Sequence, residues 1–226
     1  MNRQAPGEFY HIYNRGMQKQ PVFITDADKL RFLFLILVLQ GKNSISNVGR
    51  ELKANTEQNQ MLPISDDLVR AVLLNRTVEL VSFCLMPNHF HMIVHEVEEG
   101  GISKYMQRVQ NAYTKYFNTK YEKSGHLFQG AYKSKHIDDD IYLMHLSAYI
   151  HKNPNELVSS RWIEGNEERY YWSSFQDYIT RNRFPKLLVT SIITDRYENG
   201  REAMSYKKFV KSSSAKEFSM NLIEPK

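Results

Sequence analysis

The chain has 226 residues, of which 42% are hydrophobic, so it can bury a substantial core and general disorder is excluded. It carries 30 lysine and arginine residues against 25 aspartate and glutamate residues, and the net charge of +5 favours an anionic partner without requiring one. The most apolar stretch, residues 32–39, is far shorter than the ~20 residues that a membrane-spanning helix needs, so no membrane partner is expected.

The expected compartment follows from the N-terminus and from the single cysteine. The opening MNRQAPGEFYH has no apolar segment of the kind that a secretory signal requires. Cys84 lies in an apolar run, so we expect a buried strand thiol and not half of a disulfide or a reactive nucleophile. Both observations predict a protein of the reducing cytoplasm.

The first part of the chain predicts a strand, a helix and an insertion. Residues 8–13 mix aromatic side chains with isoleucine and run into a turn-forming cationic loop, which predicts a strand. A strongly apolar helix is predicted over 25–40, from the N-cap residue Thr25 to the glycine at position 41. Residues 42–75 are polar with weak periodicity near their end, so we expect an insertion with room for one short helix.

The middle of the chain predicts a hairpin followed by three further elements. Residues 77–85 and 90–97 are β-branched and aromatic runs, and the Pro-Asn pair between them marks a tight connection. We therefore expect an antiparallel hairpin. The later elements are a helix over 102–120, a strand over 127–137, and a helix over 140–153 that is capped by Asp138–Asp140 and ended by Pro154.

The order of these elements, β, α, β, β, α, β, α, resembles a ferredoxin-like split βαβ arrangement. We therefore predict an α+β fold, with an antiparallel sheet and helices on one face. Residues 1–154 would form the main domain, including the polar insertion at 42–75. Residues 155–226 would form a partly helical C-terminal extension.

Two histidines in the predicted hairpin are candidates for metal binding. Alternate side chains of a strand share a face, so His89 and His91 point the same way while Phe90 enters the opposite layer. Two adjacent imidazoles suit a divalent metal if another element supplies a third ligand. The alternative is a pair of solvated or hydrogen-bonded histidines without a metal.

The helix predicted over 140–153 places Tyr149 and Asn153 one turn apart on one face, with His145 a turn earlier. A tyrosine beside an amide side chain in a helix is, by itself, more typical of packing than of catalysis. Its interpretation therefore depends on the two histidines.

Taken together, Met86–His91 (MPNHFH) and Tyr149–Pro154 (YIHKNP) resemble the signatures of single-tyrosine HUH transposases. The resemblance is strongest to the REP-associated tyrosine transposases, which are IS200-like. Supporting segments occur in family order over residues 7–180: Tyr10–Gly16 (YHIYNRG), Tyr113–Asn118 (YTKYFN), Gly125–Gly130 (GHLFQG) and Tyr171–Ser174 (YWSS).

The resemblance implies a role for each candidate residue. His89 and His91 correspond to metal ligands, Tyr149 to the catalytic nucleophile, and Asn153 to a third ligand; the metal would be Mg²⁺ or Mn²⁺. Some relatives have glutamine at the last position, and asparagine keeps the amide oxygen but shortens its reach. His151 is a fallback ligand, although its spacing of two residues from Tyr149 points it away from that face.

The resemblance further implies a metal-dependent transposase whose catalytic domain is residues 1–154. It would cleave and rejoin single-stranded, hairpin-bearing DNA through a 5′-phosphotyrosine link, as a monomer or a homodimer. Because the link retains the bond energy, no ATP site is required, and the sequence has no Gly-x-x-x-x-Gly-Lys-Ser/Thr motif. Cationic candidates for contacts to DNA phosphates are Arg15, Arg108, Lys115, Lys133 and Lys135.

Three other interpretations stay open from the sequence. A split βαβ sheet with basic and aromatic residues could bind nucleic acid without cutting it. The histidine pair could activate water in a metal-dependent phosphoesterase, with Tyr149 in a structural role. A domesticated relative that processes repeated hairpins would share the transposase chemistry without moving itself.

Overall fold

The computed structural model describes residues 4–42, 62, 64–157, 165–198 and 205–213. Its sheet has four antiparallel strands in the order β2-β3-β1-β4, with β3 between β1 and β2 and with β1 between β3 and β4. This order confirms the predicted α+β fold with a split βαβ antiparallel sheet. The strands are β1 (Phe9–Arg15), β2 (Val78–Met86), β3 (His89–Glu96) and β4 (Lys133–Ile137).

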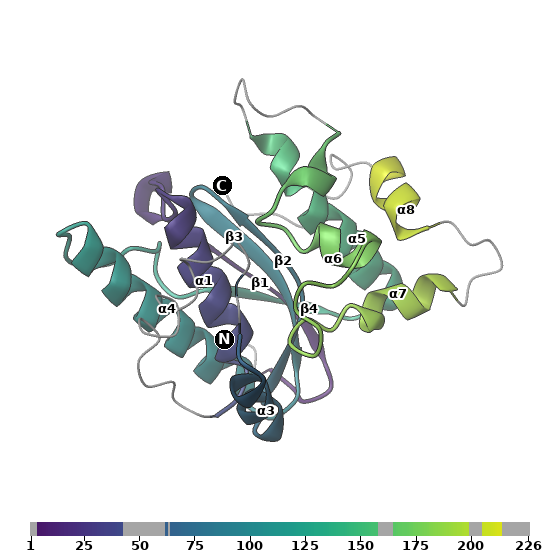
Figure 1. Ribbon diagram of the computed structural model, residues 1–226, viewed down its shortest axis with the longest axis horizontal. Helices are drawn as coiled ribbons and strands as arrows, with labels where there is room; N and C mark the ends of the chain where they lie inside the picture. The colour runs from purple at the N-terminus through teal and green to yellow at the C-terminus, as the bar shows by residue number, and fades with distance from the viewer. Residues whose placement is uncertain (1–3, 43–61, 63, 158–164, 199–204, 214–226) are drawn as a thin grey trace.

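Helices cover both faces of the sheet, whereas the sequence predicted helices on one face (Figure 1). One face packs against α1 (Asp26–Val38) and α4 (Gly101–Lys120), and the other against α5 (Asp140–Lys152) and the C-terminal helices. The physical reason lies in β2, which is buried at every position except Glu79 and therefore needs cover on both sides. The C-terminal helices are α6 (Phe175–Ile179), α7 (Ser191–Glu198) and α8 (Tyr206–Ser212).

Helix α1 forms the centre of the larger core. Phe32 to Val38 are all buried, as expected for a helix that is apolar on every side. Its first turn has a capping box between Thr25 and Asp28, in which the Asp28 carboxylate accepts the Thr25 N–H at 2.8 Å. The predicted N-cap is therefore confirmed, and the helix ends two residues before the predicted boundary.

Asp28 also joins the start of α1 to the end of α4. Its side chain is 0% exposed and accepts hydrogen bonds from Lys120 Nζ at 2.6 Å, Tyr121 Oη at 2.6 Å and Tyr116 Oη at 3.0 Å. Burial opposes the charged carboxylate, but the hydrogen bonds from Lys120, Tyr121 and Thr25 outweigh it and lower the pKa of Asp28 to about 2. Asp28 is therefore a charged link between two elements of the core.

Two predicted elements differ in extent from what the sequence indicated. The predicted strand over 127–137 forms regular strand only from Lys133, because the chain turns at Gly130, which has a positive φ. Before Lys133 the segment contacts the end of β1 through an isolated bridge between Phe128 and Gly16 and through the Gln129 N–H, which donates to Arg15 O. In the insertion, α3 (Asp66–Leu74) is the expected short helix, capped by Ser65. Residues 43–61 and 63 of that insertion lie outside the described residues.

The C-terminal extension packs along the outer edge of β2. Leu85 N–H donates to Trp172 O, Ser174 N–H donates to Phe83 O, and Val189 N–H donates to Leu80 O, each at 2.9 Å. These bonds occupy edge groups of the sheet that would otherwise be open to pairing with another chain. The partly helical character of the extension is confirmed, while the domain boundary after residue 154 stays a prediction.

Cys84 is fully buried in β2 as expected, and burial raises the pKa of its thiol. No described helix combines the length and the apolar character needed to cross a lipid bilayer. Tyr113 is also fully buried in α4 and donates to Val22 O, so it packs in the core.

Candidate active site

The two histidines of β3 lie on the face of the sheet that α5 covers. His89 and His91 pair in register with Arg15 and Tyr13 of β1, and the centroids of the two imidazole rings are 5.2 Å apart. Phe90 points into the opposite core, where its ring centroid lies 4.9 Å from that of Phe32. The predicted alternation of this strand is confirmed.

Helix α5 places Tyr149 over the same two histidines. The N-cap of the helix is Asp139, in the predicted run of aspartates, and its carboxylate accepts the Tyr142 N–H at 2.7 Å. Tyr149 lies in the third turn, is 6% exposed, and its ring centroid is 5.7 Å from that of His91. A strand pair and a helix from distant parts of the sequence therefore meet at one point.

Asn153 brings an amide oxygen to His89. Asn153 is the first residue of a short 3-10 turn (η2, Asn153–Glu156), and its Oδ1 lies 3.2 Å from Nε2 of His89. Its Nδ2 donates to the backbone oxygen of Tyr149 at 3.2 Å, so the amide nitrogen is turned to the helix and the oxygen to the histidine. The shorter side chain of asparagine therefore reaches the site.

The tautomer of His89 suits a metal between these two side chains. Nδ1 of His89 lies 2.7 Å from the amide oxygen of Asn88, which can only accept, so Nδ1 carries the ring proton. Nε2 lies within hydrogen-bond distance of Oδ1 of Asn153, at 3.2 Å, and in the neutral imidazole with its proton on Nδ1 it would offer its lone pair to a metal beside that oxygen. Two metal ligands at about 2.1 Å and at right angles are about 3 Å apart, so this spacing fits a shared cation.

The second histidine is held neutral by its surroundings. Burial lowers the pKa of His91 well below its usual range, and the nearby His11, His89 and Arg15 lower it further. The neutral imidazole is the form that coordinates a metal. The described residues contain no cluster of three His, Cys, Asp or Glu side chains that could hold a metal, so a site here depends on the Asn153 amide.

His11 has no role in the sequence-based prediction, but the structure places it directly behind His91. Nε2 of His11 lies 2.8 Å from Nδ1 of His91, and the two rings stack with centroids 5.1 Å apart. His11 is fully buried, and its Nδ1 has no hydrogen-bond partner among the described residues. The available signal was the alternation of His11 and Tyr13 on β1, which puts both on the face that carries His91.

We predict that His11 orients His91 for metal binding. If Nε2 of His91 is the ligand, its Nδ1 proton is donated to His11, and such outer hydrogen bonds are typically worth roughly 10- to 100-fold in metal affinity. His11→Leu is therefore expected to weaken Mn²⁺ binding by roughly tenfold or more, and His11→Gln to recover part of the loss. Titration of Mn²⁺ by electron paramagnetic resonance measures both. Wild-type affinity in His11→Leu would contradict the prediction.

The two histidines of α5 lie away from this site. His151, the fallback ligand, is fully buried, with Nε2 bonded to Ser174 Oγ at 2.8 Å and Nδ1 to Tyr206 Oη at 2.7 Å. Both of its ring nitrogens are therefore engaged on the side of the C-terminal extension. His145 packs against Phe209, with ring centroids 5.1 Å apart.

The five cationic candidates separate in space. Arg15 and Lys133 line a shallow pocket together with His89 and His91. Lys135 lies over the ring of Tyr142, and Lys115 borders a different groove, next to α4. Arg108 donates from Nη2 to Leu39 O at 2.8 Å at the end of α1, so its guanidinium caps a helix and is not brought to the histidines.

A His-x-His strand facing a helical tyrosine and an amide, on a split βαβ sheet, defines the class of single-tyrosine HUH transposases. The chain belongs to one family of that class: the sequence model described as "Transposase IS200 like" matches residues 40–153, half of the chain. That range contains His89, His91, Tyr149 and Asn153. The resemblance deduced from the motifs is thereby confirmed, and the family supports a transposase function.

A solved structure supports the fold independently. The chain is similar to a REP-associated tyrosine transposase that was determined bound to a REP hairpin. The TM-score is 0.50 at 15% sequence identity, and the match covers 82% of this chain and 87% of that chain. No curated protein matches the sequence.

Proposed function

We propose that this transposase is metal-dependent and cleaves and rejoins single-stranded DNA through a covalent link to Tyr149. The observation that carries the proposal is the convergence of four side chains: Tyr149 beside His91 and Asn153 beside His89, on one face of the sheet. The metal would be Mg²⁺ or Mn²⁺, held by His89, His91 and Asn153. We place the activity in the cytoplasm, whose reducing conditions suit the single buried thiol.

The chemistry assigns a task to each part of the site. When bound, a divalent cation would supply Lewis-acid stabilisation of charge on the scissile phosphate. The Tyr149 oxygen attacks phosphorus, the bond from phosphorus to the 3′-oxygen of the neighbouring nucleotide breaks, and the phenol proton ends on that 3′-oxygen. The result is a 5′-phosphotyrosine link and a free 3′-hydroxyl, and attack by a second 3′-hydroxyl reverses the step and joins a new strand.

The substrate in this proposal is single-stranded DNA that carries a hairpin. The structurally similar transposase was determined with a REP hairpin bound, and hairpin DNA is the corresponding ligand for this chain in the proposal. Arg15 and Lys133 border the pocket of the histidines, where cationic side chains would neutralise phosphates on both sides of the scissile bond. Because most phosphate contacts position the strand without reading it, these residues would hold a strand of any sequence.

A denaturing gel tests the proposal. Purified protein is incubated with end-labelled hairpin DNA bearing single-stranded flanks, with Mn²⁺, with Mg²⁺, or with a chelator. We expect a covalent protein–DNA band with metal and its loss with chelator. Free 5′-phosphate ends without that band would instead support the phosphoesterase, and binding without any cleavage would support the nucleic-acid module.

A further inference from the structure

Four side chains at alternate positions of α5 and its end point in two opposite directions. Tyr149 and Asn153, one turn apart, face the histidines of β3. Ser147 and His151, also one turn apart, are fully buried on the side that α6 and α8 of the C-terminal extension cover (Figure 1). A step of two residues turns a helix by about 200°, so the second pair lies almost opposite the first.

His151 is enclosed by aromatic rings of the C-terminal extension. Its imidazole stacks on Phe175 with ring centroids 5.3 Å apart, and the rings of Tyr178 and Tyr206 meet it edge to face at 4.9 and 5.6 Å. In these surroundings burial lowers the pKa of His151 to about 3, so the ring is neutral. A neutral imidazole has one nitrogen that donates a hydrogen bond and one that accepts.

The hydrogen bonds on the Nδ1 side of His151 identify the donor. Ser147 Oγ donates to the backbone oxygen of Met144 at 2.6 Å, and Tyr206 Oη donates to Ser147 Oγ at 2.9 Å. Because the phenol proton of Tyr206 is used there, its oxygen accepts from His151, whose Nδ1 lies 2.7 Å away. Nδ1 of His151 therefore carries the ring proton, an assignment that follows from the partners of the ring.

The partner of Nε2 completes a chain of hydrogen bonds with a single direction. Nε2 of His151 accepts from the Ser174 hydroxyl at 2.8 Å, and Ser174 Oγ accepts the Phe83 N–H of β2 at 2.9 Å. The other acceptor near this hydroxyl, Phe83 O at 3.2 Å, is farther away and already accepts the Ser174 N–H. The side chains of the chain, from β2 to α5, are Ser174, His151, Tyr206 and Ser147. A buried polar network in which each member both donates and accepts is rigid and specifies one packing.

We propose that His151 is a positioning residue, which through this chain fixes the rotation of α5 about its own axis and so holds Tyr149 and Asn153 toward the histidines of β3. This inference rests on the proposed function and deepens it, because it gives the C-terminal extension a part in the geometry of the site. Side chains reach about 5 to 6 Å from a helix axis, so a rotation of about 10° moves one by about 1 Å. A misplacement of that size can lower a rate by roughly 100-fold.

The test compares three substitutions around this chain. His151→Phe keeps a flat ring among the aromatic side chains but cannot form hydrogen bonds, so it breaks the chain at its centre. Tyr206→Phe is milder, because it removes one hydroxyl and keeps the ring beside Tyr178, with centroids 4.9 Å apart. His145→Phe is the matched control, since it makes the same change on the same helix at a residue that packs against Phe209 of α8.

Two quantities report on the position of α5, at a temperature where melting curves show each variant to be folded. One is the rate of adduct formation in a single turnover at saturating hairpin DNA, and the other is Mn²⁺ affinity by electron paramagnetic resonance. We expect His151→Phe to slow adduct formation by roughly 100-fold. It should also weaken Mn²⁺ binding toward the affinity of Asn153→Ala, which lacks the amide oxygen. Tyr206→Phe should show smaller losses of both, and His145→Phe none.

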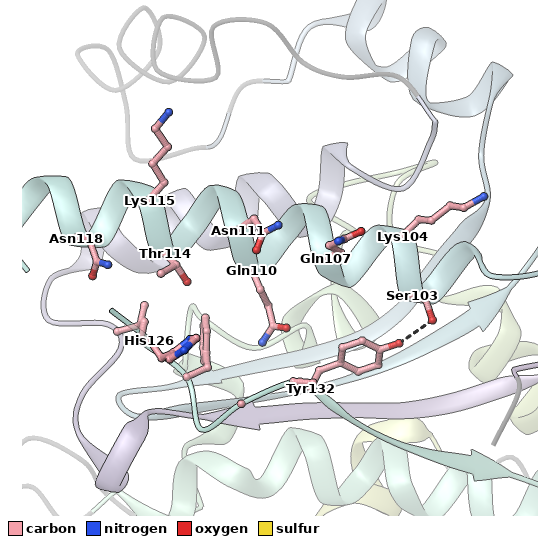
Figure 2. A pocket seen from close by; sticks show the side chains of 14 residues that line it. Ser103, Lys104, Gln107, Gln110, Asn111, Thr114, Lys115, Asn118, His126 and Tyr132 are labelled. Carbon is pink, nitrogen blue, oxygen red and sulfur yellow. Dashed lines mark hydrogen bonds between the residues drawn. The ribbon is translucent and has the colours of Figure 1, made fainter. Parts of the chain in front are cut away.

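Affinity for hairpin DNA separates positioning from folding. Measured by fluorescence anisotropy with chelator present, it should stay within about twofold of wild type, because phosphate contacts dominate such affinities. The cationic candidates lie away from the chain: Arg15 and Lys133 border the pocket of the histidines, and Lys115 borders the groove along α4 (Figure 2). A role of His151 in folding alone would lower the melting temperature and leave the rate per folded molecule unchanged.

Wild-type adduct formation and wild-type Mn²⁺ affinity in folded His151→Phe would overturn the proposal, as would equal losses in His145→Phe. If His151→Phe does not fold, Tyr206→Phe decides by the same criteria. If wild type itself forms no adduct, the proposed function fails. The Mn²⁺ affinities then still decide whether His151 positions Asn153.

Discussion

Tyr149→Phe is expected to abolish the covalent protein–DNA adduct, with a loss of at least about 10⁴-fold in cleavage. The substitution removes one oxygen, and that oxygen is the atom proposed to form the bond to phosphorus. The ring keeps its contact with His91, so metal and DNA binding should stay within about twofold of wild type. Cleavage is measured on the denaturing gel, and binding by anisotropy with Mn²⁺ present.

Tyr142→Phe is the matched control for this prediction. Tyr142 lies seven residues earlier on the same helix and therefore on the same face, two turns from Tyr149. The control loses a phenol hydroxyl of the same helix and should keep the adduct. An adduct that persists in Tyr149→Phe and disappears in Tyr142→Phe would move the nucleophile to the earlier tyrosine. If the covalent adduct persists in both variants, the proposal that a tyrosine of α5 is the nucleophile is wrong.

The metal and nucleophile candidates were accessible from sequence because local periodicity determines their geometry. His89 and His91 share a face through the alternation of a strand, and Tyr149 and Asn153 share one through the helical repeat. What periodicity cannot supply is the contact between the two pairs. The expectation that the two pairs meet came from the resemblance. In the structure the ring centroids of His91 and Tyr149 lie 5.7 Å apart.

His11 shows what the sequence could not provide. The importance of His11 depends on the register between β1 and β3, which sets it beside His91, and no pattern within β1 specifies that register.

The same limit explains the error about the layers of the sheet. Helix α5 was predicted correctly, but its sequence does not say which face of the sheet it covers. The C-terminal extension adds a second core that contains Phe175 together with Tyr170 and Tyr178, and the phenols of these two tyrosines bond to backbone oxygens of β2. Those residues are far from β2 in sequence, so their pairing could not be deduced from local patterns.

Asp28→Asn is expected to destabilise the fold strongly. Asp28 is a buried charge that accepts hydrogen bonds from Tyr116 and Lys120 of α4 and from Tyr121, which follows the helix. The variant keeps the shape but removes the charge that Lys120 and two tyrosines bind, and breaking a buried charged pair costs about 3 kcal/mol. For a chain of 226 residues this corresponds to a fall in Tm of roughly 10 °C, which calorimetry measures. Asp26→Asn is the control, because Asp26 is 78% exposed and its ion pair with Lys29 contributes little.

The pH dependence of stability provides a second readout of the same carboxylate. The pKa of Asp28 is about 2 in the folded chain, below its ordinary 3.8, so the folded state binds this proton less readily than the unfolded state. Its stabilisation, roughly 2 kcal/mol, is therefore complete above about pH 5 and is lost as the pH falls toward 2. The Asp28→Asn variant has no carboxylate at this position to protonate. The difference in unfolding free energy between it and wild type should therefore shrink between about pH 5 and about pH 2. A difference that stays constant over that range would mean that Asp28 stabilises the fold through shape alone and not through charge.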